Sequence, residues 1–276
     1  MVKCLQNCHQ AARRPVEPGE AAGAAEGFGT VRIRLLGAPV DGLTPGQFVE
    51  KVSFYIDRKE SCFLITLNPE LLYRAQFEKD LLAMLNRAQL VTADGVGIVW
   101  ACGVSGRPVP GRVTGIDLMM RLLECAAGRG WRVFFLGSAP GVAGQAAVKA
   151  AEMFPGLQVA GTHHGYFSGH ESDGVLQGIL DTSPDLLFVA LGSPRQEIWI
   201  DRHLDRLKGI VAMGVGGSLD VLSGNVRRVP EWYSRHSLEW LGRLLSQPSR
   251  WRRMLALPKF ALLVITKYGV GRISGR

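Results

Sequence analysis

Residues 186–217 read LLFVALGSPRQEIWIDRHLDRLKGIVAMGVGG, and this stretch indicates the fold. It begins with an apolar run at 186–191, which is typical of a buried strand, and a Gly-Ser-Pro turn follows the run. A helix is predicted at 195–207, and a second apolar strand at 210–213 ends in the glycine-rich turn 214–217. A strand, a helix and another strand in this order predict two parallel strands joined by a crossover helix.

The same alternation extends back to residue 31. Further strands are predicted at 31–36, 62–67, 90–93, 133–136 and 157–161, and further helices at 45–58, 69–89, 115–129, 142–153 and 175–180. We therefore expect an α/β fold with a mostly parallel sheet and helices on both faces. Ligands of such sheets bind at the carboxyl ends of the strands, and the polar turns of this chain fall there.

Charge separates the end of the chain from the rest. The 276 residues carry a net charge of +8, yet residues 227–276 alone hold nine Arg and two Lys against Glu231 and Glu239, a net of +9. Helices broken at Pro248 and Pro258 are predicted there, at 230–246, 249–256 and 258–268. We expect a mobile tail at 1–30, an α/β body at 31–226 and a basic helical appendage at 227–276. The charge of this appendage suits nucleic acid, phospholipid or a diphosphate substrate.

Several chemistries are disfavoured because their motifs are absent from the sequence. It holds no GxGxxG, which argues against a nicotinamide oxidoreductase, and no GxxxxGK[ST] or GxSxG. It also holds no Asp-x-Asp, the usual metal clamp for a nucleotide sugar diphosphate. No apolar run approaches the roughly 18 residues needed to span a bilayer. The first 27 residues have no apolar h-region, so we do not expect a signal peptide.

The histidines and cysteines indicate neither a zinc site nor a disulfide framework. The spacing of His163, His164 and His170 matches no standard zinc pattern and predicts a surface turn. Cys4 and Cys8 lack the second ligand pair of a zinc site. The three cysteines in apolar segments, Cys62, Cys102 and Cys125, are expected to be reduced thiols of a cytosolic protein.

Four elements at predicted strand ends are candidates for the site. They are Thr66-Leu67-Asn68, Asp94-Gly95, the segment 111–117 and the segment 191–197. Helix capping explains Asn68 or Asp94 taken alone, because Asn and Asp are good N-caps. The Gly-Ser-Pro turn before Gln196 points backbone N–H groups at an anion, and Gln196 would face the ligand edge or cap its own helix.

Taken together, the motifs of the chain resemble the WecG/TagA/CpsF family of bacterial glycosyltransferases over about residues 31–256. The motifs occur in this order: Asp94-Gly95, 112–117, 192–197, 214–217, Asp220, Ser223-Gly224, 228–230, 238–240, Arg243-Leu244, Pro248, Arg250 and Arg253. Members of this family build surface polymers. The best-known type transfers N-acetylmannosamine from its UDP-sugar to an undecaprenyl-diphosphate-linked N-acetylglucosamine, the linkage-unit step of wall teichoic acid synthesis. Others transfer N-acetylmannosaminuronic acid or a hexose.

The resemblance also implies a mechanism. The family is metal-independent and inverting, so no metal or other cofactor is expected. An inverting transfer needs a base for the acceptor hydroxyl, and Asp94 is the candidate because it lies at a predicted strand end where a carboxylate can meet a hydroxyl. By resemblance, Arg112 and Gln196 share the catalytic site, and Asp220 contacts uridine. The other substrate-binding candidates are Thr66, Asn68, Gly95, Gly137 and Gly192. The cations for the lipid diphosphate are Arg243, Arg250 and Arg253, because the planar fork of arginine bonds two phosphate oxygens.

Aromatic residues interleaved with arginines after residue 230 suit a membrane interface, so we expect a peripheral protein on the inner face of the cell membrane. A homo-oligomer is compatible with the sequence, whereas no nucleic-acid-binding module is visible. The competing hypothesis is a non-catalytic, membrane-associated or nucleic-acid-binding α/β protein whose strand-end residues act only as caps. The joint presence of Asp94, Arg112, Gln196 and Asp220 favours the enzyme, because capping alone does not require it.

Overall fold

The computed structural model describes residues 32–226 and 256–269. Six parallel strands form one sheet in the order β4-β3-β8-β7-β5-β6. Their bounds are β3 (Cys62–Leu67), β4 (Leu90–Ala93), β5 (Arg132–Gly137), β6 (Gln158–His163), β7 (Leu186–Ala190) and β8 (Val211–Gly214). The expected α/β fold is confirmed, and every pairing within this sheet is parallel.

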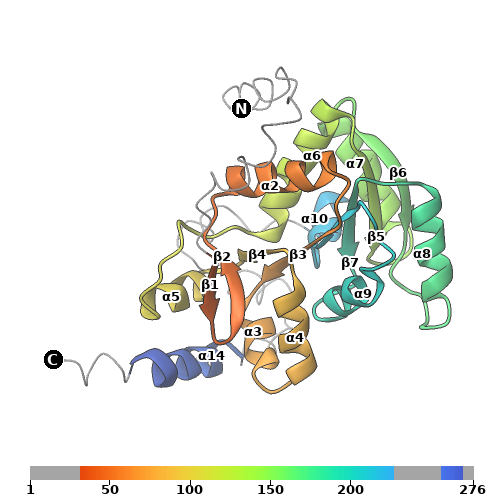
Figure 1. Cartoon of the computed structure of the whole chain (residues 1–276). Coiled ribbons are helices and arrows are strands. Elements are labelled where there is room, and N and C mark those ends of the chain that lie inside the picture. The colour runs from red at the N-terminus through yellow and green to blue at the C-terminus, as the bar shows by residue number, and fades with distance from the viewer. Residues whose placement is uncertain (1–31, 227–255, 270–276) are drawn as a thin grey trace.

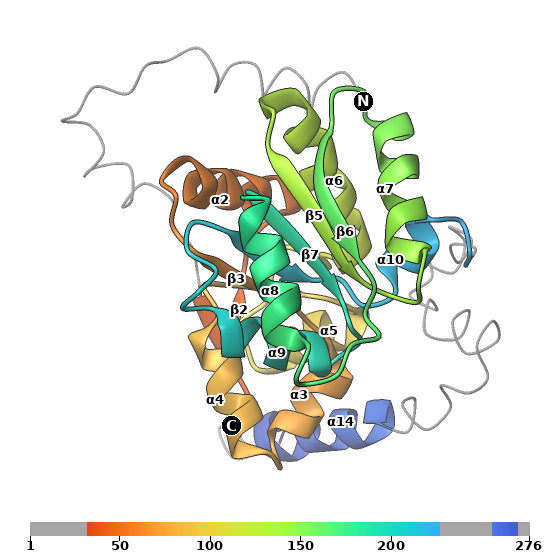
Figure 2. The ribbon, with the colours of Figure 1, turned by 90° about the vertical axis from the view of Figure 1, so that its right-hand side faces the viewer.

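Helices cover both faces of the sheet, and each face has its own apolar core (Figures 1 and 2). One core receives α3 (Pro69–Ala75), α4 (Lys79–Arg87), α5 (Val96–Val104), α8 (Ser172–Asp181), α9 (Arg195–His203) and α14 (Ala256–Val264). The other receives α2 (Pro45–Asp57), α6 (Gly115–Arg129), α7 (Val142–Met153) and α10 (Ser218–Leu222). Because both faces are covered, β3, β7 and β8 are buried along their whole length, as their continuous apolar runs predict.

The structure corrects several of the predicted elements, and α9 ends at His203 rather than at residue 207. The strand predicted at 31–36 is the first half of a hairpin, β1 (Arg32–Leu35) and β2 (Ala38–Asp41), which turns at Leu36 and Gly37 with positive φ angles at both residues. The helix predicted at 69–89 is two helices, α3 and α4. If α3 continued beyond Ala75, its buried face would next contain the charged residues Glu78 and Lys79. The break predicted at Pro258 does not occur, because Pro258 lies within the described residues of α14.

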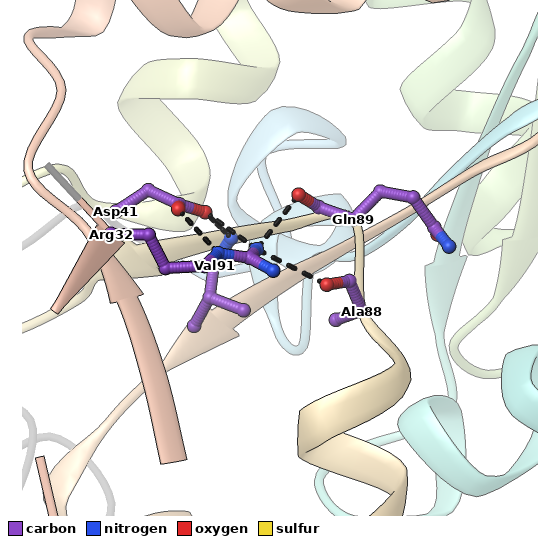
Figure 3. A network of polar contacts seen from close by, with 5 residues as sticks. All are labelled: Arg32, Asp41, Ala88, Gln89 and Val91. Atoms are coloured by element: carbon purple, nitrogen blue, oxygen red, sulfur yellow. Dashed lines mark hydrogen bonds and ion pairs between the residues drawn. The ribbon is translucent and has the colours of Figure 1, made fainter. Parts of the chain in front are cut away.

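An ion pair between exposed Arg32 and buried Asp41 joins the hairpin to β4 (Figure 3). Arg32 Nε and Nη2 donate to the two carboxylate oxygens of Asp41 at 2.7 and 3.0 Å, and Nη2 also donates to the carbonyls of Ala88 and Gln89. The same Asp41 carboxylate accepts from the Val91 backbone N–H at 2.7 Å. This network closes the outer edge of β4, the strand whose end carries Asp94.

The C-terminal helix α14 belongs to the core of the body. Phe260 and Val264 are 2% and 0% exposed and lie in the core that holds α3 and α5. Tyr268, in the π-helical turn Ile265–Gly269 after α14, accepts a hydrogen bond on its hydroxyl from Leu36 N at 2.8 Å. The predicted boundary at residue 227 therefore leaves part of the core on its C-terminal side. The other helices predicted there, at 230–246 and for most of 249–256, lie outside the described residues.

We expect Phe260→Ala to lower the free energy of unfolding by about 3–5 kcal/mol, the range for removing a fully buried phenylalanine. Leu262→Ala on the same helix is the matched control, because Leu262 is 63% exposed and its truncation should change stability by about 0.5 kcal/mol or less. Urea unfolding followed by circular dichroism measures both. If both substitutions changed the free energy of unfolding by about 0.5 kcal/mol or less, α14 would not stabilise the body.

Candidate active site

The turns after five strands converge at one edge of the sheet. Neighbouring strands β5 and β7 are followed by α7 and α9, which pack on opposite faces. Ligands of such sheets usually bind at the carboxyl ends of the strands, where the helices that follow two neighbouring strands diverge in this way. The structure therefore brings the predicted residues from the ends of β3, β4, β5, β7 and β8 to a common edge.

At the end of β3, the side chains of Thr66 and Asn68 both hold the fold. Thr66 is buried and its Oγ1 donates to the carbonyl oxygen of Gly214, at the end of neighbouring β8, at 3.1 Å. Asn68 Oδ1 accepts from Leu71 N at 2.9 Å and caps α3. The capping interpretation of Asn68 is thus confirmed, while contact of either residue with a substrate stays a prediction.

Asp94 and Arg112 lie in adjacent loops. The loop of Arg112 is joined to the end of β4 by a hydrogen bond from Val113 N to Ala93 O at 3.0 Å. The Asp94 carboxylate is half-buried and accepts from Gly115 N, at the start of α6, at 3.4 Å. A helix start favours the charged form of a carboxyl group, as a base requires.

A cavity of about 450 Å³ opens beside the loop of Arg112, between that loop, α6, Pro45 and Phe154. It is lined by Arg112, Thr114 and Asp117, and by Arg121 further along α6. Thr114 caps this helix, since its Oγ1 accepts from Asp117 N at 3.2 Å. The cavity is large enough for a sugar-sized group and places a guanidinium at its wall.

Three of the predicted glycines are required by the backbone. Gly95 and Gly192 have φ angles of 99° and 78°, which favour glycine. At Gly137 a Cβ would lie 2.4 Å from the Ala190 carbonyl oxygen, so no side chain fits there. The next residue, Ser138, donates from Oγ to Asp220 Oδ2 at 3.1 Å and thereby connects the end of β5 to α10.

Gln196 turns towards the end of β8 and does not cap its own helix. Its side chain is 2% exposed, and its Oε1 accepts from Gly216 N at 2.9 Å. Its Nε2 donates to Glu197 Oε1 at 2.8 Å. Burial raises the pKa of Glu197, and the hydrogen bond from Gln196 opposes this effect. Glu197 was part of the quoted motif, but reasoning from the sequence gave it no role.

A family model described as the glycosyl transferase WecG/TagA/CpsF family matches residues 33–272. The chain belongs to this family. Three relatives carry the name N-acetylglucosaminyldiphosphoundecaprenol N-acetyl-beta-D-mannosaminyltransferase. The one from Bacillus spizizenii is 39% identical over 76% of this chain and 81% of its own length. Those from Bacillus subtilis and Staphylococcus aureus are 36% and 33% identical, over 79% and 84% of this chain and 84% and 91% of their own lengths.

Parts of the predicted site of this glycosyltransferase fall outside the described structure. Arg243, Arg250 and Arg253 lie in the undescribed range 227–255. Within the described ranges, no group of three or more His, Cys, Asp or Glu side chains could hold a metal ion. Among those same residues, no helix has the length and apolar character to cross a membrane. Independence from metal and attachment to a membrane both stay predictions.

We expect Glu197→Gln to change how the stability of this glycosyltransferase depends on pH. A carboxyl group whose pKa is raised by folding binds its proton more tightly in the folded state, so the parent loses stability as pH rises above about 4.3 towards the folded pKa. Glutamine does not titrate in this pH range, so the stability of the variant relative to the parent should increase as pH rises. Urea unfolding at several pH values from about 5 to 8 compares the two. Parallel pH profiles would contradict the buried, titrating carboxyl.

Proposed function

We propose that the chain transfers N-acetylmannosamine from UDP-N-acetylmannosamine to undecaprenyl-diphosphate-linked N-acetylglucosamine, with inversion and without a metal. This is the linkage-unit step of wall teichoic acid synthesis. The observation that carries the proposal is the 39% identity to a relative whose name states this transfer, over 81% of that relative's length. The convergence of Asp94, Arg112, Gln196 and Asp220 on one sheet edge supports it independently.

In the proposed reaction Asp94 is the general base. The acceptor hydroxyl oxygen forms a bond to the anomeric carbon, the bond from that carbon to the diphosphate oxygen breaks, and UDP leaves with the electron pair. The hydroxyl proton passes to the Asp94 carboxylate. The contact of Asp94 with the start of α6 supports this role, because the N–H of Gly115 stabilises the carboxylate before it accepts the proton.

The leaving diphosphate is neutralised by protein cations in this proposal. Arg112 is the described candidate, and Arg243, Arg250 and Arg253 are the candidates from the basic segment. Asp220 accepts from the uracil N–H, and its bond from Ser138 supports this role by fixing the carboxylate at the end of β5.

We further propose that the C-terminal segment attaches the enzyme to the inner face of the cell membrane. In α14 and the turn after it, Leu262 is 63% exposed and Ile265 is 49% exposed, with exposed Lys259 and Lys267 beside them in the sequence. Helix α5, which contacts α14, adds Trp100 at 41% exposure. Exposed apolar and aromatic side chains with adjacent lysines suit an anionic membrane interface.

Chelation is the quickest test of the proposed chemistry. We expect UDP to raise the melting temperature of the protein to the same extent with and without EDTA, and transfer of the sugar to continue in EDTA. The reason is that arginines rather than Mg²⁺ neutralise the diphosphate in this account. ADP is the matched control for the nucleotide. A strict requirement for Mg²⁺ or Mn²⁺ would contradict the proposed neutralisation, and the absence of any shift with UDP would contradict the donor.

A further inference from the structure

We infer that Glu197 is a positioning residue of this site, which acts by holding the Gln196 side-chain amide in the one orientation that fixes the turn after β8. The inference rests on the proposed function, because the turn leads into the helix that carries the uridine-side candidate Asp220.

The hydrogen bonds of Gln196 leave its amide no second orientation. Its Oε1 accepts from the backbone N–H of Gly216 at 2.9 Å, and its Nε2 donates to Glu197 Oε1 at 2.8 Å. If the amide were reversed, its N–H groups would face the Gly216 N–H and its oxygen would face the Glu197 oxygen. In a side chain that is 2% exposed, the first contact would leave two donors facing each other, and the second would be unfavourable for the ionised carboxyl. The Gly216 N–H and the carboxylate of Glu197 therefore select the observed orientation together.

Gln196 lies directly against the end of β8. A Cβ built on Gly214 would lie 2.6 Å from Gln196 Nε2, so only glycine leaves room for the amide. The carbonyl of the same Gly214 accepts from Thr66 Oγ1 at 3.1 Å. The end of β8 is therefore held by Thr66 from β3 and by Gln196 from α9, and α10 begins at Ser218, two residues after Gly216.

The burial of the Glu197 carboxyl group is unfavourable for the stability of the fold. Its side chain is 1% exposed, and within residues 32–226 and 256–269 its Oε2 has no hydrogen-bond partner. A buried polar atom without a partner destabilises a fold and needs an explanation. An aliphatic side chain would fill the same space without that penalty, but it would give the Gln196 amide nothing to donate to. Orientation of Gln196 supplies the explanation.

Two substitutions separate orientation from mere packing. Glu197→Leu fills the space but removes the acceptor for Gln196, whereas Glu197→Gln keeps an acceptor oxygen and removes the charge. We expect the leucine variant to lose about 10- to 100-fold in kcat/KM, the scale on which a small misplacement in an active site acts. The glutamine variant should stay within about 3-fold of the parent, since the acceptor is retained. Glu197→Met serves in place of leucine if that variant does not fold.

Amide hydrogen exchange measures the order of the turn after β8 independently of catalysis. The Gly216 N–H should exchange at least about 10-fold faster in the leucine variant than in the parent, with amides of β5 unchanged, and should stay protected in the glutamine variant. Unchanged Gly216 exchange in the leucine or methionine variant would overturn the inference, as would an equal loss of kcat/KM in the glutamine variant. If the parent transfers no sugar while Gly216 exchange responds as expected, the proposed function fails and the positioning role stands.

Discussion

Asp94→Asn is expected to lower turnover by roughly 100-fold or more while UDP affinity stays unchanged, the usual scale for loss of a general base. Asparagine has nearly the same shape and retains an oxygen that can accept from Gly115 N, so the loop and the start of α6 should be preserved. The substitution removes the capacity to take the acceptor's proton together with the negative charge of the side chain. Initial rates with saturating donor, together with UDP titration by calorimetry, separate the two quantities.

Asp173→Asn is the control for this experiment. Asp173 is an exposed carboxylate on α8 that pairs with Arg206 and lies outside the proposed site. Its substitution should leave turnover unchanged, because surface ion pairs contribute little. If Asp94→Asn retained turnover within a few-fold of the parent, Asp94 would be removed from the role of base.

Replacing Arg243, Arg250 and Arg253 together by Gln is expected to remove most transferase activity and weaken binding to anionic vesicles. Each basic residue near an anionic leaflet contributes about 1 kcal/mol, so three should change the partition coefficient by about 100-fold. Binding should also weaken steeply with salt, since exposed charges are screened over about 8 Å at physiological ionic strength. Vesicle sedimentation at several salt concentrations measures this, and turnover on a lipid-diphosphate acceptor measures activity.

The packing of α14 in the core determines which variants can test this second prediction. Deleting residues 227–276 would also remove Phe260 and Val264 from the core, so the truncated chain would confuse misfolding with lost binding. The arginine replacements leave α14 in place. The matched control replaces exposed Arg202, Arg206 and Lys208 by Gln, an equal change of charge in the last turn of α9 and the segment that follows it. Full turnover in the first triple variant would exclude these arginines from the site.

Much of the fold could be predicted because the hydrophobic pattern of most segments matches their burial in the structure. The bounds of β3, β4, α6 and α7 are those predicted, since each apolar strand or amphipathic helix ends at a turn residue. Helix α5 could not be found this way, because it is apolar nearly throughout and holds Gly97 and Gly103, so no helical face stands out. The hairpin was missed because β2 begins with Ala38-Pro39 and lacks the β-branched run of the other strands.

The candidate site was predictable in its residue types but not in its contacts. A polar side chain after a strand marks the edge of the sheet, which places Asn68, Asp94 and Gln196 without further information. Gly216, which donates to the Gln196 side chain, lies 20 residues away in the turn after β8, and nothing local in the sequence specifies this contact. Glu197 looks like an ordinary first-turn helix acid, and only its burial distinguishes it.

Turnover with a panel of UDP-sugars tests the central claim most directly. The purified full chain would be given UDP-N-acetylmannosamine, UDP-N-acetylmannosaminuronic acid, UDP-glucose or UDP-N-acetylglucosamine, each with a prenyl-diphosphate-linked N-acetylglucosamine acceptor. The account predicts that UDP-N-acetylmannosamine is used with the highest kcat/KM and yields an inverted linkage. Preference for another UDP-sugar would contradict the assigned donor, and no transfer from any of them to this acceptor would contradict the proposed function.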